Sequence, residues 1–305
     1  MGTVRGVVCA FTAAMAFMFA SGSHAAQDAG AKDDPLTKPI ALEYADAFGE
    51  PGAPRLVHGA TWALGSPMLS VTVIDSGEGL LLIDAGLAQW APQIATELAM
   101  IGHDIRDLRY ILSSEPHYDH ASGIAALVRA SGAQVVASAA GAAVLRAGHS
   151  ERNDPQLGEL FAYPPVASVR TIADGETIVL GDLVVTAHAT PGHTPGSMSW
   201  SWRSCAGPQG APNCETIVAA ASLTSRTDGT YRFSAPANAA ALSAFREGLA
   251  RLAELDCDRV IAGHPAHAQA SGATGAEPCR RLGRYYAKAL DAQLAAESGQ
   301  ESGVN

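Results

Sequence analysis

The 305-residue sequence lacks several features on which whole classes of proteins depend. It has no cluster of Lys and Arg and a formal net charge of −10, which argues against nucleic acid and anionic membranes as partners. After residue 25, no apolar run is long enough to cross a bilayer. No Cys-x-x-Cys spacing occurs, so cysteine is a poor candidate for a metal ligand. The acidic residues are scattered and indicate a solvated surface.

The N-terminal segment, residues 1–25, is typical of a secretory signal peptide. Arg5 is its only charge, an apolar run follows at 7–20, and small residues stand at 23–25, near the expected cleavage position. The apolar run is short for a helix that spans a membrane. We therefore expect an exported protein that acts in the periplasm or outside the cell.

The rest of the chain is long enough for one large domain with a substantial core. Residues 26–40 carry Gln, Asp, Gly, Lys and Pro with few apolar anchors, and are predicted to be flexible. A single domain is expected over residues 41–292, followed by a polar and frayed tail at 293–305.

Cysteine usage agrees with export, because Cys9 leaves with the signal peptide and four cysteines remain. Four cysteines allow three pairings. Cys205 and Cys214 bracket a turn rich in Gly and Pro, which favours a disulfide that closes a hairpin. Cys257 and Cys279 would then join the end of one helix to the start of the last. Each disulfide is worth about 2–4 kcal/mol.

Apolar runs predict two sets of strands with helices between them and after them. The first set is expected at 70–74, 79–83, 109–112 and 134–137, and the second at 169–172, 177–180, 183–188, 197–202, 216–219 and 258–261. Helices are expected through residues 94–101, 121–131, 242–252 and 277–296. This order is compatible with two sheets packed face to face and helices outside, although other α/β layouts remain open.

The most informative run is residues 115–120, with the sequence Glu-Pro-His-Tyr-Asp-His. It places two imidazoles and up to two carboxylates after a strand-like stretch, and loops held by a rigid sheet usually carry function. His193 and His264 lie in turns bounded by Gly and Pro, and each follows a glycine that permits a sharp backbone. Zinc takes histidine nitrogen and carboxylate oxygen. The pattern therefore predicts a hydrolytic metal site.

Residues 115–120 resemble the His-x-His-x-Asp-His motif of the metallo-β-lactamase superfamily, with Glu115 in place of the first histidine. The turns that contain His193 and His264 match this superfamily unchanged, and residues 80–86 resemble its strand that ends in Asp-x-Gly. More narrowly, the chain resembles the third subclass of class B β-lactamases, through segments at 60–62, 163–165, 195–200 and 221–224. The likeness covers residues 57–292. It implies an α/β fold, the four-layer αββα sandwich, with a metal site where the two halves meet.

The resemblance implies one or two zinc ions per chain, with two expected. One position would be held by Glu115, His117 and His193, and the other by Asp119, His120 and His264. Carboxylate oxygen can replace imidazole nitrogen on zinc, so Glu115 is expected to bind metal. The alternative is that Glu115 faces solvent and the first position is weak or empty. An anion in place of a neutral histidine also lowers the net charge around the metal. The metal then lowers the pKa of its bound water less.

Several other residues receive roles from the resemblance. Asp84 is expected to orient a ligand by hydrogen bonding, although a turn at a strand end explains it nearly as well. Ser222 and Thr224 stand where the resembling β-lactamases hold the substrate carboxylate, and Trp62 either lines the groove or packs in the core. His188 is interpreted as a core histidine. The histidines without a partner pattern are predicted to be surface residues: His58, His103, His149 and His267.

Together these features predict a secreted, monomeric zinc enzyme that hydrolyses β-lactam antibiotics through attack of a metal-activated water, with Asp119 orienting that water. Many other hydrolases of the superfamily place a bridging Asp between the last two histidine turns, and residues 218–224 contain no carboxylate. One alternative is a secreted metal-dependent lactonase or related ester hydrolase. Another is a metal-binding member with impaired catalysis, because one ligand is altered.

Overall fold

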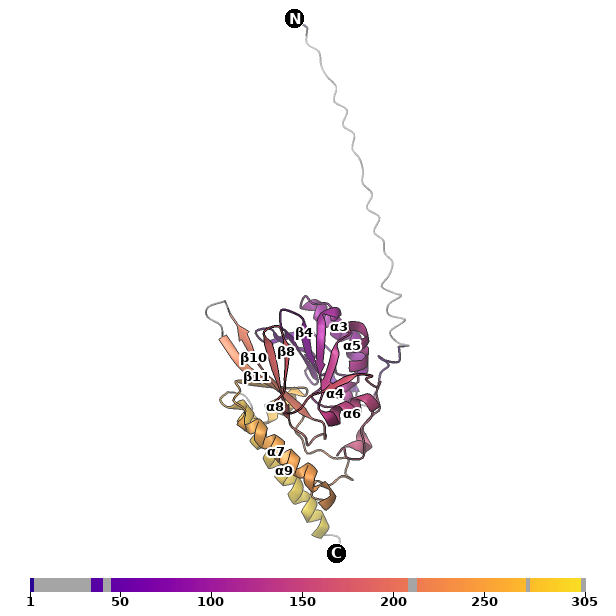
Figure 1. The fold of residues 1–305 in the computed structure, drawn as a ribbon, viewed down its shortest axis with the longest axis vertical. Helices are drawn as coiled ribbons and strands as arrows, with labels where there is room; N and C mark the ends of the chain where they lie inside the picture. The colour runs from indigo at the N-terminus through magenta and orange to yellow at the C-terminus, as the bar shows by residue number, and fades with distance from the viewer. Residues whose placement is uncertain (3–33, 41–44, 208–212, 273–274, 303–305) are drawn as a thin grey trace.

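The computed structural model describes residues 1–2, 34–40, 45–207, 213–272 and 275–302. Apart from its first two residues, the predicted signal peptide lies outside the described residues. Two β-sheets lie face to face at the centre, and helices cover the outer side of each (Figure 1). The predicted αββα sandwich is therefore confirmed. Within the described part of the chain, no helix is long and apolar enough to cross a membrane.

The first sheet has seven strands that neighbour one another in chain order. They are β1 (Arg55–His58), β2 (Thr61–Gly65), β3 (Ser70–Asp75), β4 (Leu80–Ile83), β5 (Leu108–Leu112), β6 (Gln134–Ala137) and β7 (Val169–Thr171). The pairs from β1 to β4 are antiparallel, and those from β4 to β7 are parallel. The parallel strands need crossover connections, and these carry the helices on the outer face.

The second sheet has five strands in the order β12-β11-β10-β9-β8. They are β8 (Thr177–Leu180), β9 (Leu183–Ala189), β10 (Met198–Ala206), β11 (Asn213–Ala220) and β12 (Arg259–Ala262). All pairs are antiparallel except β11 with β12. The sequence predicts the strands of both sheets except β1 and β2, whose short runs lack a long apolar pattern.

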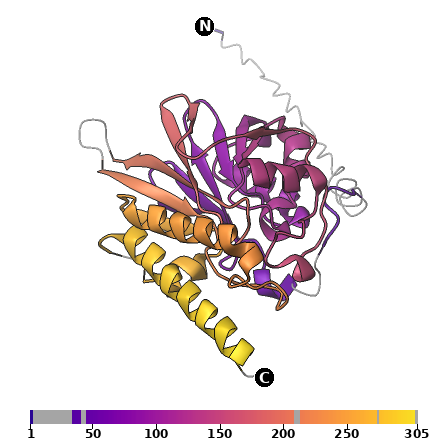
Figure 2. The same cartoon turned by 60° about the horizontal axis from the view of Figure 1, so that its bottom comes forward.

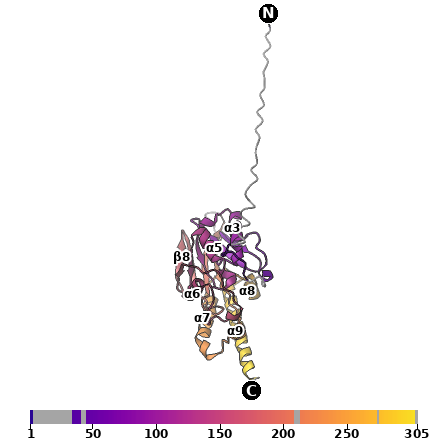
Figure 3. The ribbon, with the colours of Figure 1, turned by 90° about the vertical axis from the view of Figure 1, so that its right-hand side faces the viewer.

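Helices cover both outer faces. The elements on the side of the first sheet are η2 (Ala88–Trp90), α3 (Ala91–Met100), η3 (Ile105–Asp107), α4 (Tyr118–Ala121), α5 (Ile124–Ser131) and α6 (Ala139–Ala147). Two long helices, α7 (Ala239–Glu254) and α9 (Pro278–Ser302), lie side by side on the second sheet (Figure 2). The end of α9 extends beyond the sheets (Figure 3). Shorter elements are α2 (Ala45–Phe48), η4 (Leu157–Glu159), η5 (Pro236–Asn238) and α8 (Pro265–Ala270).

Strand β4 shows how the core is divided. Leu80 and Leu82 pack in the cluster between the first sheet and its helices. Leu81 and Ile83 point the other way, into the cluster between the two sheets. Side chains alternate along a strand, so a strand buried on both faces is apolar throughout. This explains the unbroken Leu-Leu-Leu-Ile run and fixes the position of the Asp84 turn that follows it.

Two segments at the ends of the domain are more ordered than the sequence predicts. Within the segment predicted to be flexible, residues 34–40 are described, and Leu36 and Ile40 pack against the core. The tail predicted to begin at 293 continues as helix α9 to Ser302. Glu297 is buried there, and its carboxylate accepts hydrogen bonds from the backbone amides of Phe233 and Ser234. A few buried or hydrogen-bonded side chains are thus enough to order these two segments.

Both predicted cysteine pairs meet in space. The sulfur atoms of Cys205 and Cys214, which stand opposite each other on β10 and β11, lie 2.03 Å apart. Those of Cys257 and Cys279 lie 1.99 Å apart and connect the segment after α7 to the first turn of α9. The geometry therefore agrees with the hairpin pairing over the two alternatives.

Candidate metal centre

The six predicted ligands come from loops that meet at one edge of the sandwich. Residues 115–120 follow β5 and run into α4, whereas His193 lies in the turn between β9 and β10 and His264 lies between β12 and α8. The structure brings the six together as the two sets that the resemblance implies. The first group is Glu115, His117 and His193, and the second group is Asp119, His120 and His264. In each group, ligand atoms from all three residues lie within 4.8 Å of one another.

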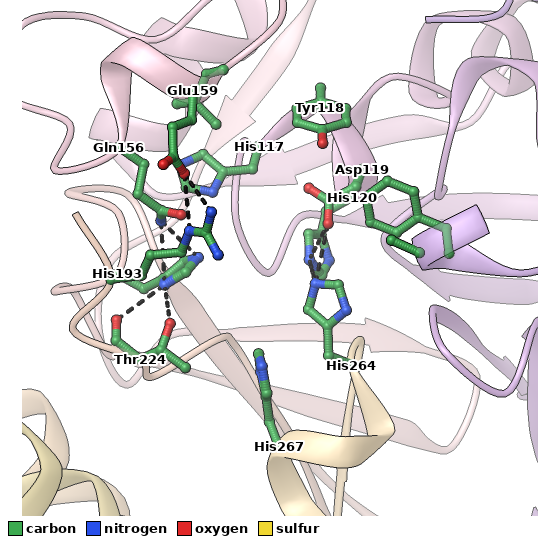
Figure 4. A pocket seen from close by; sticks show the side chains of 14 residues that line it. His117, Tyr118, Asp119, His120, Gln156, Glu159, His193, Thr224, His264 and His267 are labelled. Atoms are coloured by element: carbon green, nitrogen blue, oxygen red, sulfur yellow. Dashed lines mark hydrogen bonds and ion pairs between the residues drawn. The ribbon is translucent and has the colours of Figure 1, made fainter. Parts of the chain in front are cut away.

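Five of the six candidate ligands, all but Glu115, line one cavity of about 540 Å³. In Figure 4, the histidines of the first group and the three residues of the second group lie on opposite sides of this cavity. Glu115 is fully buried and contacts ligands of both groups. The complete lining is Ala47, Phe48, His117, Tyr118, Asp119, His120, Gln156, Glu159, Leu160, His193, Thr224, Arg226, His264 and His267.

Glu115 faces both groups with its two carboxylate oxygens. Its Oε1 accepts a hydrogen bond from the Ser222 hydroxyl at 2.6 Å and lies 3.0 Å from Nε2 of His120. Its Oε2 lies 3.4 Å from Nε2 of His193 and 4.0 Å from Nδ1 of His117. Among the described residues, Oε2 has no hydrogen-bond partner although it is buried. A buried anionic oxygen without a donor is costly, and a cation between these atoms would satisfy it.

The charges of the cavity also favour a cation. Burial alone would raise the pKa of Glu115 and Asp119, but the facing histidines hold both carboxyl groups below their usual pKa range. Burial alone would lower the pKa of His120, yet Glu115 and Asp119 raise it well above its ordinary value. Carboxylates without water must be neutralised by positive charge. Metal ions meet this demand at neutral pH, so the residues fit the implied ions.

His193 differs from His120. Burial lowers the pKa of His193 to about 4, although the nearby Glu115 acts to raise it. The ring is therefore neutral at physiological pH. Its Nδ1 donates to the backbone oxygen of Thr224 at 3.1 Å, and the Thr224 hydroxyl lies 2.8 Å from the same nitrogen. This arrangement leaves Nε2 as the lone-pair atom that faces Glu115. A neutral imidazole in a fixed tautomer is the form that binds zinc.

The other three histidines are held in the same way by one ring nitrogen each. Asp154 contacts Nε2 of His117 at 3.0 Å, and Asp84 contacts Nδ1 of His120 at 3.0 Å. The backbone oxygen of Met68 lies 3.3 Å from Nδ1 of His264. The second nitrogen of each ring faces the other candidate ligands, with Nε2 of His120 also near Glu115. The ligand atoms assigned in this way are Nδ1 of His117 and Nε2 of His120, His193 and His264.

Asp84 takes the position that the resemblance implies for it. It directly follows β4 and adopts a left-handed backbone conformation, with φ of 63°, that Asp tolerates better than most residues. Its carboxylate also accepts from the amide and hydroxyl of Ser114 at 2.7 and 2.5 Å. Asp84 thus connects the end of β4 to the start of the ligand loop.

Sequence reasoning missed Asp154 and Gln156. Asp154 is buried and pairs with His117, and the Gln156 amide nitrogen lies 3.1 Å from Nε2 of His193. Both belong to a polar loop without a motif or a strand pattern. The only local signal is an Asp-Pro pair, which is typical of any turn. Their role follows from how this loop folds back over the ligands, which the sequence does not display.

The residues predicted to hold substrate have different surroundings from those expected. Trp62 packs against the core on the helix side of the first sheet and is absent from the cavity lining, which favours core packing over the groove wall among the two alternatives. Ser222 is buried, and its hydroxyl contacts Glu115. Thr224 lines the cavity, but its hydroxyl contacts His193. Both hydroxyls are therefore engaged with the first group.

Two histidines predicted to lie on the surface are not there. His267 lines the cavity, with its ring centroid 5.0 Å from that of His264, and burial lowers its pKa to about 4. His58 is buried at the end of β1 and lies 3.6 Å from Glu215. His58 ends strand β1 and His267 lies in helix α8, and the sequence predicted neither element. These elements turn the two rings inward. His149 is exposed, as predicted.

Comparison with known proteins agrees with this geometry. The metallo-β-lactamase superfamily profile matches residues 68–205. Hydroxyacylglutathione hydrolase of Anaeromyxobacter dehalogenans is 30% identical over 232 residues, which are 69% of this chain and 80% of that protein.

Among solved structures, a B3 metallo-β-lactamase with an active-site glutamic acid is 43% identical, with a TM-score of 0.81 over 87% of this chain and 99% of that one. MEM-A1, a subclass B3 metallo-β-lactamase from a soil metagenome library, is 39% identical, with a TM-score of 0.76 over 83% of this chain and 99% of that one. The chain belongs to the metallo-β-lactamase superfamily, and within it to subclass B3, as a variant with Glu115 in place of the first histidine of the motif.

Proposed function

We propose that this chain is a zinc-dependent hydrolase that opens the ring of β-lactam antibiotics and thereby confers resistance. The observation that carries the proposal is the pair of ligand groups on one cavity, with the Oε2 atom of Glu115 buried and without a hydrogen bond among the described residues. The 43% identity to a B3 enzyme with an active-site glutamic acid supports the same reading.

The donor atoms favour zinc. Four imidazole nitrogens and two carboxylates suit a borderline-soft dication better than Mg²⁺ or Ca²⁺, which prefer oxygen ligands. The first group would hold one ion through Glu115, His117 and His193, and the second group would hold another through Asp119, His120 and His264. When bound, the two ions supply Lewis-acid polarisation of a carbonyl and a more acidic water.

The side chains of the cavity supply the remaining chemistry. Asp119 lines the cavity, and its Oδ2 lies 3.1 Å from Nε2 of His264, so its carboxylate can accept a hydrogen bond from the attacking water and orient it. Its lowered pKa keeps it ionised for this role at neutral pH. Asp84 and Asp154 fix the ring planes of His120 and His117, which keeps the site rigid during turnover.

A second function within the superfamily is favoured by one observation, the 30% identity to a hydroxyacylglutathione hydrolase. Against it stands the stretch at 218–224, which contains no carboxylate to bridge two ions. In the structure this stretch instead contributes Ser222, whose hydroxyl contacts Glu115. An impaired member is disfavoured because the second group is complete and each histidine ring is held.

The test is a side-by-side assay of the mature protein loaded with zinc. A chromogenic cephalosporin, a lactone and a glutathione thioester would be offered at equal concentration, together with metal analysis. We expect turnover of the cephalosporin, its loss with a chelator, and recovery with zinc. Turnover of lactone or thioester without β-lactam turnover would refute the proposal, and the absence of all three in a folded, zinc-loaded protein would support the impaired member.

Two variants assign the second group. His120→Ala and His264→Ala should each remove most activity and one equivalent of zinc, because both rings would bind the same ion. His149→Ala is a matched control, since His149 is exposed and bonds only to the neighbouring Ser150 oxygen among described contacts. Near-normal rates in either ligand variant would contradict the assignment.

Export to the periplasm is part of the same proposal. It rests on the signal-like sequence of residues 1–25 and on the two cysteine pairs, which are typical of an oxidising compartment. N-terminal sequencing of the protein recovered from a periplasmic extract should begin close to residue 26. An intact N-terminus on cytoplasmic protein would contradict export.

A further inference from the structure

Arg226 lies at the side of the cavity formed by the first group. Thr224, two residues earlier, contacts His193, and both Thr224 and Arg226 line the cavity. Among the described lining residues, Arg226 is the one Arg or Lys. The Ser222 hydroxyl donates to Glu115, and the Thr224 hydroxyl accepts from His193 and carries no charge. A substrate anion that enters this side of the cavity therefore meets the Arg226 guanidinium as the available charged donor.

The guanidinium is paired with Glu159 on the opposite loop. Its Nε and Nη2 donate to one oxygen, Oε2, at 2.9 and 2.6 Å. Both side chains are largely exposed, at 64% for Arg226 and 40% for Glu159. An exposed pair of this kind contributes little net stability, because water and salt screen it. The pair can consequently open at small cost when another carboxylate competes for the guanidinium.

The two loops that carry this pair are fixed to each other. Asp228 accepts a hydrogen bond from the Gly158 amide at 3.0 Å, and its own amide donates to the Pro155 oxygen at 2.9 Å. The same carboxylate accepts from the Thr230 hydroxyl and amide and from the Tyr231 amide. These contacts hold the backbone of the two loops together, so Arg226 and Glu159 start from fixed positions beside the cavity.

We propose that Arg226 binds the carboxylate of the substrate, and that Glu159 occupies the guanidinium until the substrate displaces it. The inference rests on the proposed function, because β-lactam antibiotics carry a carboxylate beside the reacting amide. The exchange replaces one carboxylate on Arg226 with another and releases Glu159 to water. A bidentate pair with planar geometry is the interaction that arginine makes best with a carboxylate. The site then selects anionic substrates over their neutral esters.

Three substitutions test the exchange by steady-state kinetics on the zinc-loaded enzyme. Arg226→Ala should raise KM for a cephalosporin about tenfold with little change in kcat, as expected when one charge-assisted contact is lost. Glu159→Gln should lower KM severalfold, because the competitor for Arg226 is weakened. In the double variant, Glu159→Gln should have no further effect, since Glu159 acts through Arg226. Arg226→Lys should recover part of the loss.

A neutral substrate and a remote pair provide the controls. The methyl ester of the same cephalosporin should show equal KM values in wild type and Arg226→Ala. Arg246→Ala removes a similar exposed pair, with Asp291 at 2.9 Å on the outer helices, and should leave KM unchanged. Equal KM for the carboxylate form in wild type and Arg226→Ala would overturn the proposal, as would an equal increase in KM for the ester.

Binding separates failure of this inference from failure of the proposed function. Calorimetric titration of the zinc-loaded protein with the hydrolysed cephalosporin measures affinity without turnover. If wild type turns over no β-lactam yet binds this product about tenfold more tightly than Arg226→Ala, the Arg226 site stands and the proposed function fails. Equal affinities, or no binding by either protein, overturn the Arg226 site whatever the turnover, and the proposed function is then decided by turnover alone.

Discussion

The hydroxyl of Ser222 donates a hydrogen bond to Oε1 of Glu115 at 2.6 Å, across 107 residues of sequence. The Ser222 amide lies 3.4 Å from the same oxygen. Ser222, which is expected to hold the substrate carboxylate, thus contacts the residue that replaces the first histidine. The glutamate and the serine have to be considered as one unit, because the serine satisfies one carboxylate oxygen and leaves the other for metal.

Ser222→Ala should therefore weaken metal binding at the first group more than substrate binding. Removal of a hydrogen bond to a metal ligand typically costs roughly 10–100-fold in metal affinity. Competition with a chromophoric chelator would measure the affinity, and KM would be measured with saturating zinc. Ser243→Ala, on the exposed face of α7, is the control. A raised KM with unchanged metal affinity would instead support the substrate-binding role that the sequence predicts for Ser222.

Two substitutions of Glu115 should have opposite effects. Glu115→Ala should reduce zinc stoichiometry from two to one while Asp119, His120 and His264 retain their ion. Glu115→His should restore the common pattern and shift the pH–rate profile to lower pH, because it removes a negative charge from the metal environment. Zinc affinity of the wild-type first group should fall as pH drops, since its ligands bind only when deprotonated. Unchanged stoichiometry in Glu115→Ala would show that Glu115 is a bystander.

The sequence predicted the parts of this molecule that depend on short local patterns. Strands β6 and β8 were predicted to the residue, because each is an apolar run bounded by turn residues. The six candidate ligands were found because they lie in a compact motif and in two glycine-bounded histidine turns. A buried strand and a tight turn each leave a signal within ten residues, and such signals can be recognised without the fold.

The contacts that complete the site join residues that are far apart in the sequence. Asp154 and Ser222 reach His117 and Glu115 from loops 37 and 107 residues away, and Arg226 meets Glu159 across 67 residues. Nothing in a polar loop shows which side chain will turn inward, because this depends on how two distant loops close over each other. The helix α6 was also missed, because its short sequence is mostly alanine and shows no marked helical spacing of large apolar residues.

Asp154 should be a positioning residue for the first group. It is buried and accepts from Nε2 of His117, which directs Nδ1 toward Glu115. Asp154→Ala should lower zinc affinity by roughly 10–100-fold and lower stability by about 1–3 kcal/mol, because His117 loses a buried partner. Asp154→Asn keeps an acceptor and should recover much of the affinity. Equal zinc affinity in wild type and Asp154→Ala, measured by chelator competition, would contradict this role.

The two cysteine pairs should differ in their effect on stability. They are separated by 9 and 22 residues, and a longer loop restricts the unfolded chain more. Loss of Cys257–Cys279 should therefore cost about 1 kcal/mol more than loss of Cys205–Cys214, measured by urea unfolding of the paired Cys→Ser variants. Peptide mapping under non-reducing conditions should find both pairs. A cross-linked Cys205–Cys279 peptide would contradict this pairing.

Glu97 on α3 should make stability depend on pH independently of the metal site. Its side chain is fully buried, and burial raises the pKa of the carboxyl although the Gly65 amide and the Gln93 side chain act to lower it. A carboxyl with a raised folded-state pKa stabilises the fold below its unfolded pKa of about 4.3, and this contribution is lost as pH rises through the folded pKa.

Glu97→Gln removes this titration and keeps an oxygen that can accept from Gly65. The free energy of unfolding of the variant should therefore increase relative to that of wild type as pH rises above about 4.3. The increase is at most roughly 1.4 kcal/mol per pH unit, and the difference becomes constant once pH exceeds the folded-state pKa of Glu97. Urea unfolding of both proteins at matched pH and saturating zinc would measure the difference. Glu247→Gln, on the exposed face of α7, should show no such trend. A difference between wild type and Glu97→Gln that stays the same from pH 4 to pH 8 would mean that Glu97 is ionised in the fold without penalty.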